Sequence, residues 1–267
     1  MKILLLLVCI SFGGYVSAQT KNVGLIKYEG TINMIDTINA SLVMDYLLLF
    51  NDVESTFFYT DATRKINIDG SVVPLTGNKN KMVQVYQNFN NKTVTATNAS
   101  IGTSYLVKDA MALIPWKILN KSKKIQNIEC FSAIAEYRGR VWTAWYAPSI
   151  PISSGPWKLY GLPGMILEAE DLKKLIKFEC VAITVPPPTD IAIETPKAKN
   201  TKTNEQPITT KEFSDLTRKD IENAEKMSYT PEGQNYYPVR DIEIFDFEAN
   251  KYFMKRRQQK LSDIPKK

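Results

Sequence analysis

The sequence predicts a mainly β protein: a strongly curved antiparallel sheet or open barrel, with one amphipathic helix in the C-terminal half. Short runs rich in β-branched and aromatic residues recur along the chain, separated by Asn, Asp and Gly clusters typical of turns. The runs leave little room for crossover helices, so neighbouring strands are expected to pair antiparallel. We expect strands at residues 23–35, 45–50, 55–59, 65–68, 82–88, 93–96, 104–107, 117–119, 125–135, 141–147, 165–170, 175–185 and 239–247.

Two hairpins can be argued in detail. The first is expected to turn near Tyr137-Arg138-Gly139, and its return strand puts Arg140, Trp142, Ala144 and Tyr146 on one face. The second is expected to turn at residues 171–174 and to return through Leu175 to Val185.

Residues 186–210 interrupt this pattern. They contain five prolines and a run of Lys, Asn and Thr, which bury too little apolar surface to fold, so we expect a mobile excursion. After it, Thr209 and Glu212 have the spacing of a capping box. Apolar residues at helical spacing then predict an amphipathic helix over residues 211–226.

The N-terminus has the pattern of a secretory signal peptide over residues 1–18. Lys2 precedes an apolar stretch at residues 3–12, and Val16-Ser17-Ala18 form a cleavage pattern before Gln19. Cys9 raises the alternative of a lipid anchor, but Val8 stands where a lipoprotein signal needs a small residue. No later segment is long and apolar enough to span a bilayer, so we expect an exported protein, periplasmic or secreted, without a transmembrane segment.

The remaining chain is expected to form one β-rich domain over residues 19–250, followed by a basic tail at 251–267. The whole chain has a formal net charge of +6. Seven Lys and Arg residues against the single acid Asp263 place that surplus in the tail. A nucleic-acid-binding protein spreads its basic residues over a folded face, so no nucleic-acid partner is expected.

Cys130 and Cys180 are the two cysteines left after cleavage of the signal peptide. In an oxidising compartment an even pair is a disulfide candidate, and two buried thiols in one core are the equal alternative. The chain has no histidine, and these cysteines lack the close spacing of a zinc site, so no metal or cofactor is expected.

The segment from Gly155 to Leu167, GPWKLYGLPGMIL, specifies a fixed backbone shape. Gly161 and Gly164 can adopt a positive φ at no steric cost, whereas Pro163 fixes its own φ and restricts Leu162 to extended conformations. The segment therefore predicts a turn that leads into a buried strand at Met165.

This segment resembles the GLPGLI family, whose name is the hexapeptide matched here by residues 161–166, with Met165 in place of Leu. The resemblance extends upstream through Gly155-Pro156-Trp157-Lys158, residues 139–146 and Cys130, and back to Trp116-Lys117-Ile118. It implies an exported or envelope protein of Bacteroidota-type Gram-negative bacteria, with no established activity.

An aromatic group around this segment is the best candidate for a binding site. It comprises Trp142, Trp145, Tyr146, Trp157 and Tyr160, with Arg138, Arg140 and Lys158 among them. These residues predict either an apolar groove with a cation at its lip or a core packed beneath a rigid loop. The candidate ligand- or partner-binding residues are Arg140, Trp142, Trp145, Tyr146, Trp157, Gly161, Leu162, Pro163 and Gly164. We expect Trp157 to be partly exposed.

The sequence gives no positive support for an enzyme. Without histidine, triads of the serine–histidine or cysteine–histidine kind are excluded, and no phosphate-binding glycine loop is present. Glu168, Glu170 and Asp171 are carboxyl groups near the signature, but Glu168 and Glu170 alternate on one strand face, as on an exposed surface. No catalytic residue is assigned.

Two functions of different classes follow. The first is a periplasmic carrier or binding protein that holds an apolar ligand in the concave sheet. The second is an interaction protein that docks on an outer-membrane or envelope partner through the Gly-Pro-Trp and Gly-Leu-Pro-Gly segment. A cavity lined by Trp142, Trp145 and Met165 would favour the first, and a convex, exposed signature loop would favour the second.

Overall fold

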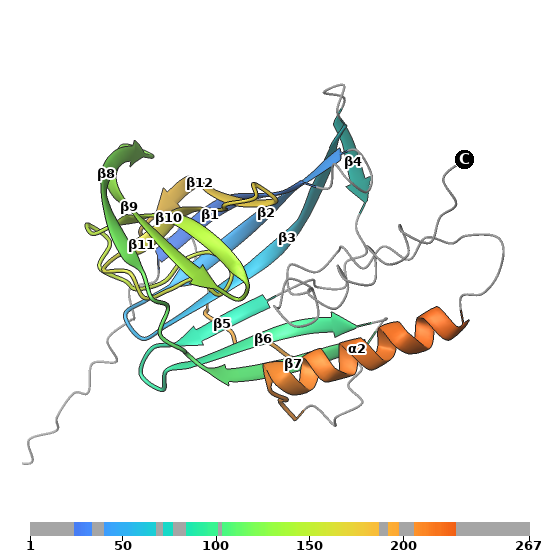
Figure 1. Ribbon diagram of the computed structural model, residues 1–267. Helices are drawn as coiled ribbons and strands as arrows, with labels where there is room; N and C mark the ends of the chain where they lie inside the picture. The colour runs from blue at the N-terminus through green and yellow to red at the C-terminus, as the bar shows by residue number, and fades with distance from the viewer. Residues whose placement is uncertain are drawn as a thin grey trace, which may run out of the picture.

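The protein was analysed as a computed structural model, which describes residues 24–33, 40–67, 72–76, 84–100, 103–186, 192–197 and 206–227. The expected signal peptide at 1–18, the strand at 239–247 and the tail at 251–267 lie outside the described residues. The described chain is mainly β, as the sequence predicts, with one helix in the C-terminal half (Figure 1).

Twelve antiparallel strands of the described chain form one sheet. In chain order they are β1 (Gly24–Asn33), β2 (Ala40–Phe50), β3 (Glu54–Asn67), β4 (Val72–Thr76), β5 (Gln84–Asn88), β6 (Thr93–Ser100), β7 (Thr103–Ala110), β8 (Lys117–Ile125), β9 (Ile128–Tyr137), β10 (Arg140–Ala147), β11 (Met165–Asp171) and β12 (Ile176–Thr184). Their order across the sheet is β7-β6-β5-β3-β2-β1-β12-β11-β10-β9-β8, and β4 pairs with the far end of β3.

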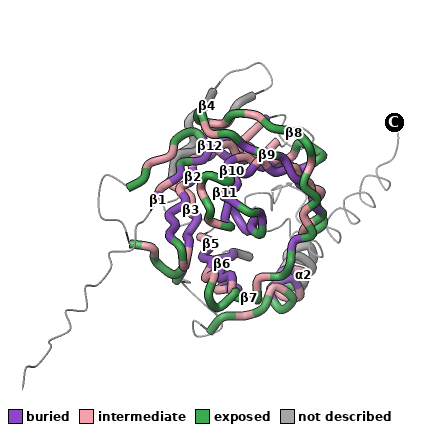
Figure 2. The backbone as a smooth tube through the Cα atoms, turned by 90° about the vertical axis from the view of Figure 1, so that its left-hand side faces the viewer, coloured by how far each residue is buried: buried purple, intermediate pink, exposed green. Residues whose placement is uncertain are grey.

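The strong curvature of the sheet follows from a short connection. β7 and β8 are the two ends of this order, yet only residues 111–116 join them. Laid flat, eleven strands would put these edges about 48 Å apart, whereas six linking residues span at most about 25 Å. The sheet must therefore curl, and Figure 2 shows the chain running round with buried residues toward the inside. Among the described strands no pairing closes β7 onto β8.

An aromatic cluster occupies the concave face at the centre of the sheet. Tyr28, Tyr46, Phe57 and Phe178 come from four different strands and are almost fully buried. The Tyr46 and Phe57 rings stack at 4.9 Å, and Phe178 meets both rings edge-on. The hydroxyl of Tyr28 donates a 2.6 Å hydrogen bond to the carbonyl of Ile166, so this core also holds the strand that follows the signature segment.

Helix α2 (Thr210–Met227) covers the β6–β7 end of the sheet. Phe213 packs on Tyr105 and Val107 of β7, with Ile208 and Leu216 beside them. The expected capping box is confirmed, because the backbone N–H of Thr209 donates to Glu212 at 2.7 Å and the N–H of Glu212 donates to the Thr209 hydroxyl at 3.2 Å. The expected helix bounds differ from the observed ones by one residue at each end.

One expectation about the chain path was wrong. Residues 125–135 were expected as one strand, but Gln126 and Asn127 have φ values of 48° and 63° and form the tight turn between β8 and β9. The expected mobility of residues 186–210 stays a prediction, although described parts of this segment contact the sheet. Ile208 forms a parallel bridge with Val107, Pro196 is buried, and the carbonyl of Glu194 accepts a hydrogen bond from Gln84.

Candidate functional site

The signature segment lies against the concave face rather than on the surface. Trp157, Leu159 and Leu162 are each at most 2% exposed and belong to the same core cluster as the central aromatic residues. The rings of Trp157 and Trp142 are 5.8 Å apart. The expectation that Trp157 is partly exposed was therefore wrong, because the loop between β10 and β11 folds inward and fills the curve of the sheet.

The backbone of this loop has the shape that its glycines predict. Gly161 and Gly164 have φ values of 94° and 150°, which confirms the expected positive φ. A Cβ at Gly164 would lie 2.3 Å from the carbonyl oxygen of Ala147, so only glycine fits there. A Cβ at Gly161 would meet Trp116 at no less than 3.6 Å. Trp157 itself has a φ of 55°, a rare conformation for a bulky side chain.

Backbone hydrogen bonds tie the two ends of the loop together. The N–H of Met165 donates to the Ile150 carbonyl at 2.9 Å, and that of Ile166 donates to the Ser154 carbonyl at 2.9 Å. Gly161 donates to the Ser153 hydroxyl at 2.9 Å. Only Gly161 and Pro163 of the Gly-Leu-Pro-Gly stretch are exposed, and Leu162 and Gly164 are buried.

Buried polar groups join the loop to the opposite strands. The hydroxyls of Ser154 and Ser55 are 2.9 Å apart, and Ser154 also donates to the Gln87 side chain at 3.2 Å. Gln87 in turn lies 3.5 Å from the carbonyl of Trp157, to which it donates. Because these groups are buried, each satisfied bond holds the loop in one position on β3 and β5.

Tyr160 is clamped by the connection between β7 and β8. Its carbonyl accepts a 2.7 Å hydrogen bond from the indole of Trp116, and its hydroxyl donates to the carbonyl of Ala112 at 2.6 Å. Burial is the main cause that raises the pKa of the Tyr160 hydroxyl above its ordinary value, and the neighbouring Tyr137 adds to it. A tyrosine in this state is a poor proton donor at neutral pH.

Arg140 is not at the lip of a groove, as the aromatic-groove hypothesis placed it. It is buried, and its guanidinium donates a 2.5 Å bond to the carboxylate of Asp171. The other oxygen of Asp171 accepts the N–H groups of Leu175 and Ile176, so the pair holds the β11–β12 turn. Burial lowers the pKa of Arg140, and Asp171 opposes that shift. The arrangement is a buried structural ion pair.

The other two aromatic candidates also have structural contacts. Tyr146 is buried and its ring lies 6.3 Å from that of Phe131. Trp145 lies half-buried on the opposite face of its strand, under the ammonium of Lys123 at 4.5 Å. Lys123 also forms a 2.6 Å ion pair with Glu168. Any binding role of the nine candidate residues stays a prediction.

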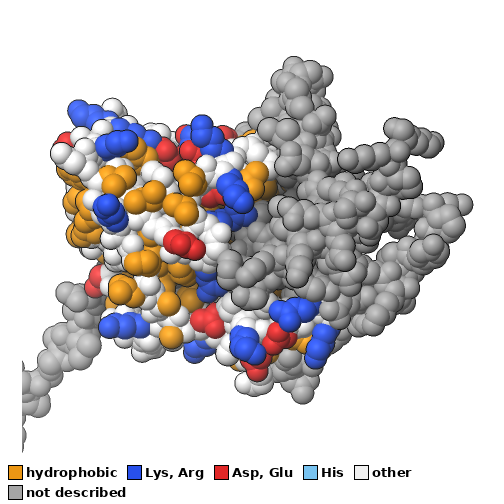
Figure 3. All heavy atoms as spheres, in the orientation of Figure 1, with side chains coloured by type: hydrophobic (Ala, Val, Ile, Leu, Met, Phe, Trp, Pro, Cys, Tyr) orange, Lys and Arg blue, Asp and Glu red, His pale blue; other side chains and the backbone are white. Residues whose placement is uncertain are grey.

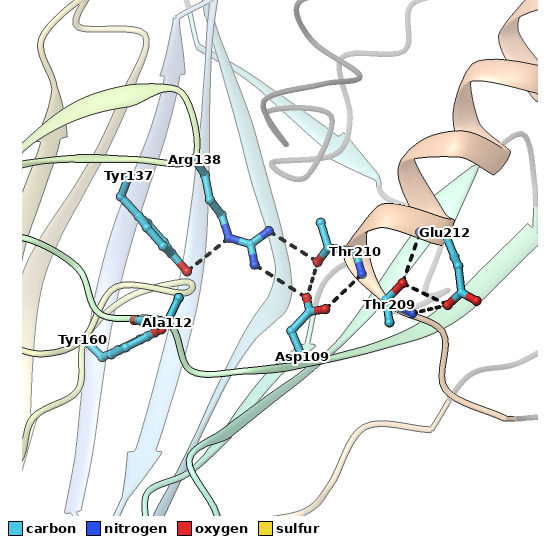
Figure 4. Close-up of polar contacts among 8 residues, drawn as sticks. All are labelled: Asp109, Ala112, Tyr137, Arg138, Tyr160, Thr209, Thr210 and Glu212. Atoms are coloured by element: carbon cyan, nitrogen blue, oxygen red, sulfur yellow. Dashed lines mark hydrogen bonds and ion pairs between the residues drawn. The ribbon is translucent and has the colours of Figure 1, made fainter.

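A polar junction connects three parts of the fold that are distant in sequence (Figure 4). Asp109, at the end of β7, accepts hydrogen bonds from the backbone N–H of Thr210 at 3.0 Å and from the Thr210 hydroxyl. Arg138, in the β9–β10 turn, forms a 3.7 Å ion pair with Asp109 and donates to Tyr137 at 3.1 Å. We call Asp109, Arg138 and Thr210 the Asp109 junction. It links the start of α2 to the end of β7 and to the β9–β10 turn.

Cys130 and Cys180 are both buried, free thiols in the structure. Burial is the main cause that raises the pKa of Cys130 to about 11 and that of Cys180 to about 12, and the presence of Cys130 contributes to the shift of Cys180. Both thiols are therefore protonated at neutral pH. The disulfide itself stays a prediction.

The described residues contain no group of three or more Cys, Asp or Glu side chains arranged to hold a metal ion. Glu168 is engaged with Lys123, and Asp171 with Arg140. No helix in the described part of the chain is both long and apolar enough to cross a membrane.

One surface feature escaped the sequence reasoning: the lysine-rich strand β8 at an edge of the sheet. Its sequence, KILNKSKKI, has four lysines and no acidic residue. Figure 3 shows hydrophobic side chains interspersed with Lys and Arg on the part of this face where β8 to β11 lie. The charge imbalance within nine residues was the available signal, but the expected strands covered only residues 117–119 and Ile125 of this stretch.

A family model matches residues 135–168, the stretch from β9 through the signature loop into β11. The family is described as "Protein of unknown function (Porph_ging)". The match fits a Bacteroidota-type family and assigns no activity. No curated protein matches the chain.

Among solved structures, PNGF-II is similar in two crystal forms. The P21 form matches with a TM-score of 0.44 and 15% identity, over 63% of this chain and 29% of that one. The C2 form matches with a TM-score of 0.41 and 15% identity, over 63% of this chain and 28% of that one. The similar region spans less than a third of PNGF-II, and a likeness at this level carries no argument about function.

Proposed function

We propose that this chain is an exported, non-enzymatic interaction protein of the bacterial envelope, which binds a partner through its outer surface. The observation that carries the proposal is the burial of the signature loop inside the curve of the sheet. Trp157, Leu159 and Leu162 occupy the concave face that a carrier would offer to an apolar ligand. The surface that remains for binding is the outside of the sheet and its edges.

Export is supported by the N-terminal pattern of Lys2, the apolar stretch and the Val16-Ser17-Ala18 site. We further infer that the matched family is the GLPGLI family, since residues 161–166 lie inside the matched range and reproduce its hexapeptide with one change. The intact mass of protein exported by its own host tests the first inference. A chain starting at Gln19 without an acyl group is expected, and a chain that retains residues 1–18 or carries a lipid on Cys9 would contradict it.

The carrier hypothesis keeps one observation in its favour. The indole N–H groups of Trp142 and Trp157 are buried and have no acceptor among the described residues. A buried donor without a partner calls for an explanation, and an oxygen atom of a bound molecule is one. The two functions therefore differ in whether a small molecule should co-purify with the protein.

Native mass spectrometry of the exported protein decides between them. The interaction protein is expected at the mass of the chain alone, with the same melting temperature before and after extraction with organic solvent. A stoichiometric small molecule that is removed by extraction, together with a lower melting temperature afterwards, would support the carrier instead.

Binding at the exposed edge of the sheet is tested in cells with photo-crosslinking residues. Exposed positions such as Ile118 and Leu113 are expected to crosslink to one envelope partner, and Leu172, in the β11–β12 turn, serves as the matched exposed control. Crosslinks of equal yield from all three positions would indicate non-specific contact and would count against the proposal.

A further inference from the structure

The two edge strands of the sheet, β7 and β8, differ in what covers them. At the β7 edge, Ile208 adds a parallel bridge, with hydrogen bonds from Lys108 N–H to the Ile208 carbonyl and from Ile208 N–H to the Leu106 carbonyl, both 2.8 Å. Helix α2 then covers the face behind it. At the other edge β8 pairs with β9 alone among the described strands. Its outer side therefore offers backbone donors and acceptors.

The β8 edge is strongly basic. Lys123 is engaged with Glu168 and Trp145, but Lys117, Lys121 and Lys124 are exposed and take part in no ion pair within the described chain. Lys124 is placed opposite Glu129 of β9, which is the one acidic residue facing β8 in the register. The edge thus carries an excess of positive charge that the fold does not neutralise.

Apolar side chains accompany these lysines. Ile118 is 55% exposed and Phe131 is 36% exposed. Ile118 is opposite Ala133, and Phe131 lies two residues before Ala133 on β9, so both side chains belong to the same face of the sheet. The register shift between Ile118 and Ser122 leaves residues 119–121 without partners on β9.

We propose that β8 is a docking edge for an extended, acidic peptide segment of a partner protein, which adds to the sheet as a further strand. This inference rests on the proposed function and names its surface and the chemistry of its partner. Backbone hydrogen bonds to β8 supply affinity, as in other cases of strand addition. Carboxylates of the segment contact Lys117, Lys121 and Lys124, and an apolar side chain of it covers Ile118 and Phe131.

Charge decides which occupant fits. A second copy of this chain would bring lysines against lysines, and like charges directly opposite across a strand pair are destabilising. Lysines on an edge are also a common device against such self-pairing. An acidic segment would instead be attracted by the same lysines, which would also fix its register on β8. If the lysines serve only to prevent aggregation, an acidic strand should find no specific site.

The test uses the full mature chain and a fluorescent peptide of alternating Glu and Thr, matched in length to β8. A peptide of alternating Lys and Thr is the matched control. We expect the acidic peptide alone to bind, more weakly at high ionic strength, and amide hydrogen exchange to slow in β8 while other exposed segments stay unchanged. Binding without protection in β8, or no binding, would overturn the proposal.

Charge-reversed variants locate the site. Lys117→Glu with Lys121→Glu is expected to weaken binding of the acidic peptide at least about tenfold. Lys108→Glu with Lys173→Glu makes the same charge change at the covered edge and in an exposed turn, and is expected to leave binding within about twofold. Equal losses in both pairs would show a diffuse charge effect and would sink the proposal.

Anionic vesicles of phosphatidylglycerol and phosphatidylcholine separate a membrane surface from a peptide. Vesicle binding that depends on Lys117 and Lys121, without peptide binding, would replace the proposal with a lipid-facing role. The crosslinking experiment separates failure of the β8 docking edge from failure of the proposed function. A partner crosslinked only at sites away from β8 would overturn the docking edge and leave the proposed function standing, whereas a lipid in the core would overturn the proposed function itself.

Discussion

The two halves of the curved sheet bury their concave faces by different means. In the half formed by β9 to β12, an insertion between two adjacent strands folds back inside and fills the curve with Trp157, Leu159 and Leu162. In the half formed by β5 to β7, a helix that comes much later in the chain supplies the cover through Phe213. The first cover is continuous with the core, whereas the second is a separate small cluster held by caps and a polar junction. Damage to the first should spread, and damage to the second should stay local.

The largest effect is expected from Gly164→Val. A side chain there would meet the backbone of Ala147 and Pro148 within 3 Å, at a φ that a β-branched residue avoids. We expect loss of the folded state, or destabilisation by more than about 4 kcal/mol in urea unfolding. Gly161→Ala is the matched control, because its φ is also positive but its nearest contact is 3.6 Å away, and should cost only about 1 kcal/mol. Equal effects would mean that the loop is not a fixed part of the core.

The second-largest effect is expected from Trp157→Ala. It should lower the free energy of unfolding by about 3–5 kcal/mol, because it removes a large buried side chain. The matched variant Trp145→Ala removes the same side chain from the half-buried outer side and should cost much less. Melting temperatures of the two variants check this order. An unchanged melting temperature for Trp157→Ala would instead support the hypothesis that the signature segment is a binding surface.

Phe213→Ala should release the helix and leave the other half intact. The side chain packs against Tyr105 at 5.6 Å between ring centroids, in a cluster separate from the main core. We expect a loss of about 2–3 kcal/mol that appears as faster amide exchange in α2 and β7. If protection in β9 to β12 falls equally, the two halves unfold as one unit and the comparison fails.

A smaller effect is expected from Asp109→Ala at the Asp109 junction. The change removes the acceptor of the Thr210 N–H and the partner of Arg138, which should cost about 1–2 kcal/mol. Asp52→Ala alters an exposed carboxylate in the β2–β3 turn and serves as the control. The contribution of each residue is separated by an Asp109 and Arg138 double-mutant cycle. Additive losses would show that the ion pair contributes nothing beyond the cap.

The smallest effect concerns pH. The backbone N–H of Thr209 is the main cause that lowers the pKa of Glu212 below its ordinary value of 4.5, and the Thr209 hydroxyl adds to it. A carboxylate with a lowered folded-state pKa stabilises above its unfolded pKa, and this contribution is lost as the pH falls through the folded value. Fraying at the start of α2, measured by amide exchange at Thr209, should therefore increase in acid. Glu212→Gln should remove the pH dependence, and its persistence would assign it to another group.

The sequence predicted the parts of this fold that depend on local chemistry. Arg138-Gly139 and Thr209 with Glu212 are recognisable turn and cap signals, and the structure has both. Gln126-Asn127 lacks glycine, so the turn between β8 and β9 was missed. The burial of Trp157 depends on where the whole loop between β10 and β11 folds. The alternation of apolar and polar residues along a strand gives no information about that. The aromatic group was visible in sequence, but its side of the sheet was not.

The strand order has a consequence for how the chain reaches its folded state. β1 to β7 and β8 to β12 are two runs in which partners lie close in sequence, and they meet where β1 pairs with β12, with Leu25 opposite Thr184. Contacts of such high sequence separation form late, because a long loop must close before they contribute free energy. β1 is synthesised before the other described strands, yet its second neighbour, β12, is the last strand of the sheet to be synthesised. Until β12 arrives, β1 exposes an open edge, and a chaperone that binds extended segments would find its target there.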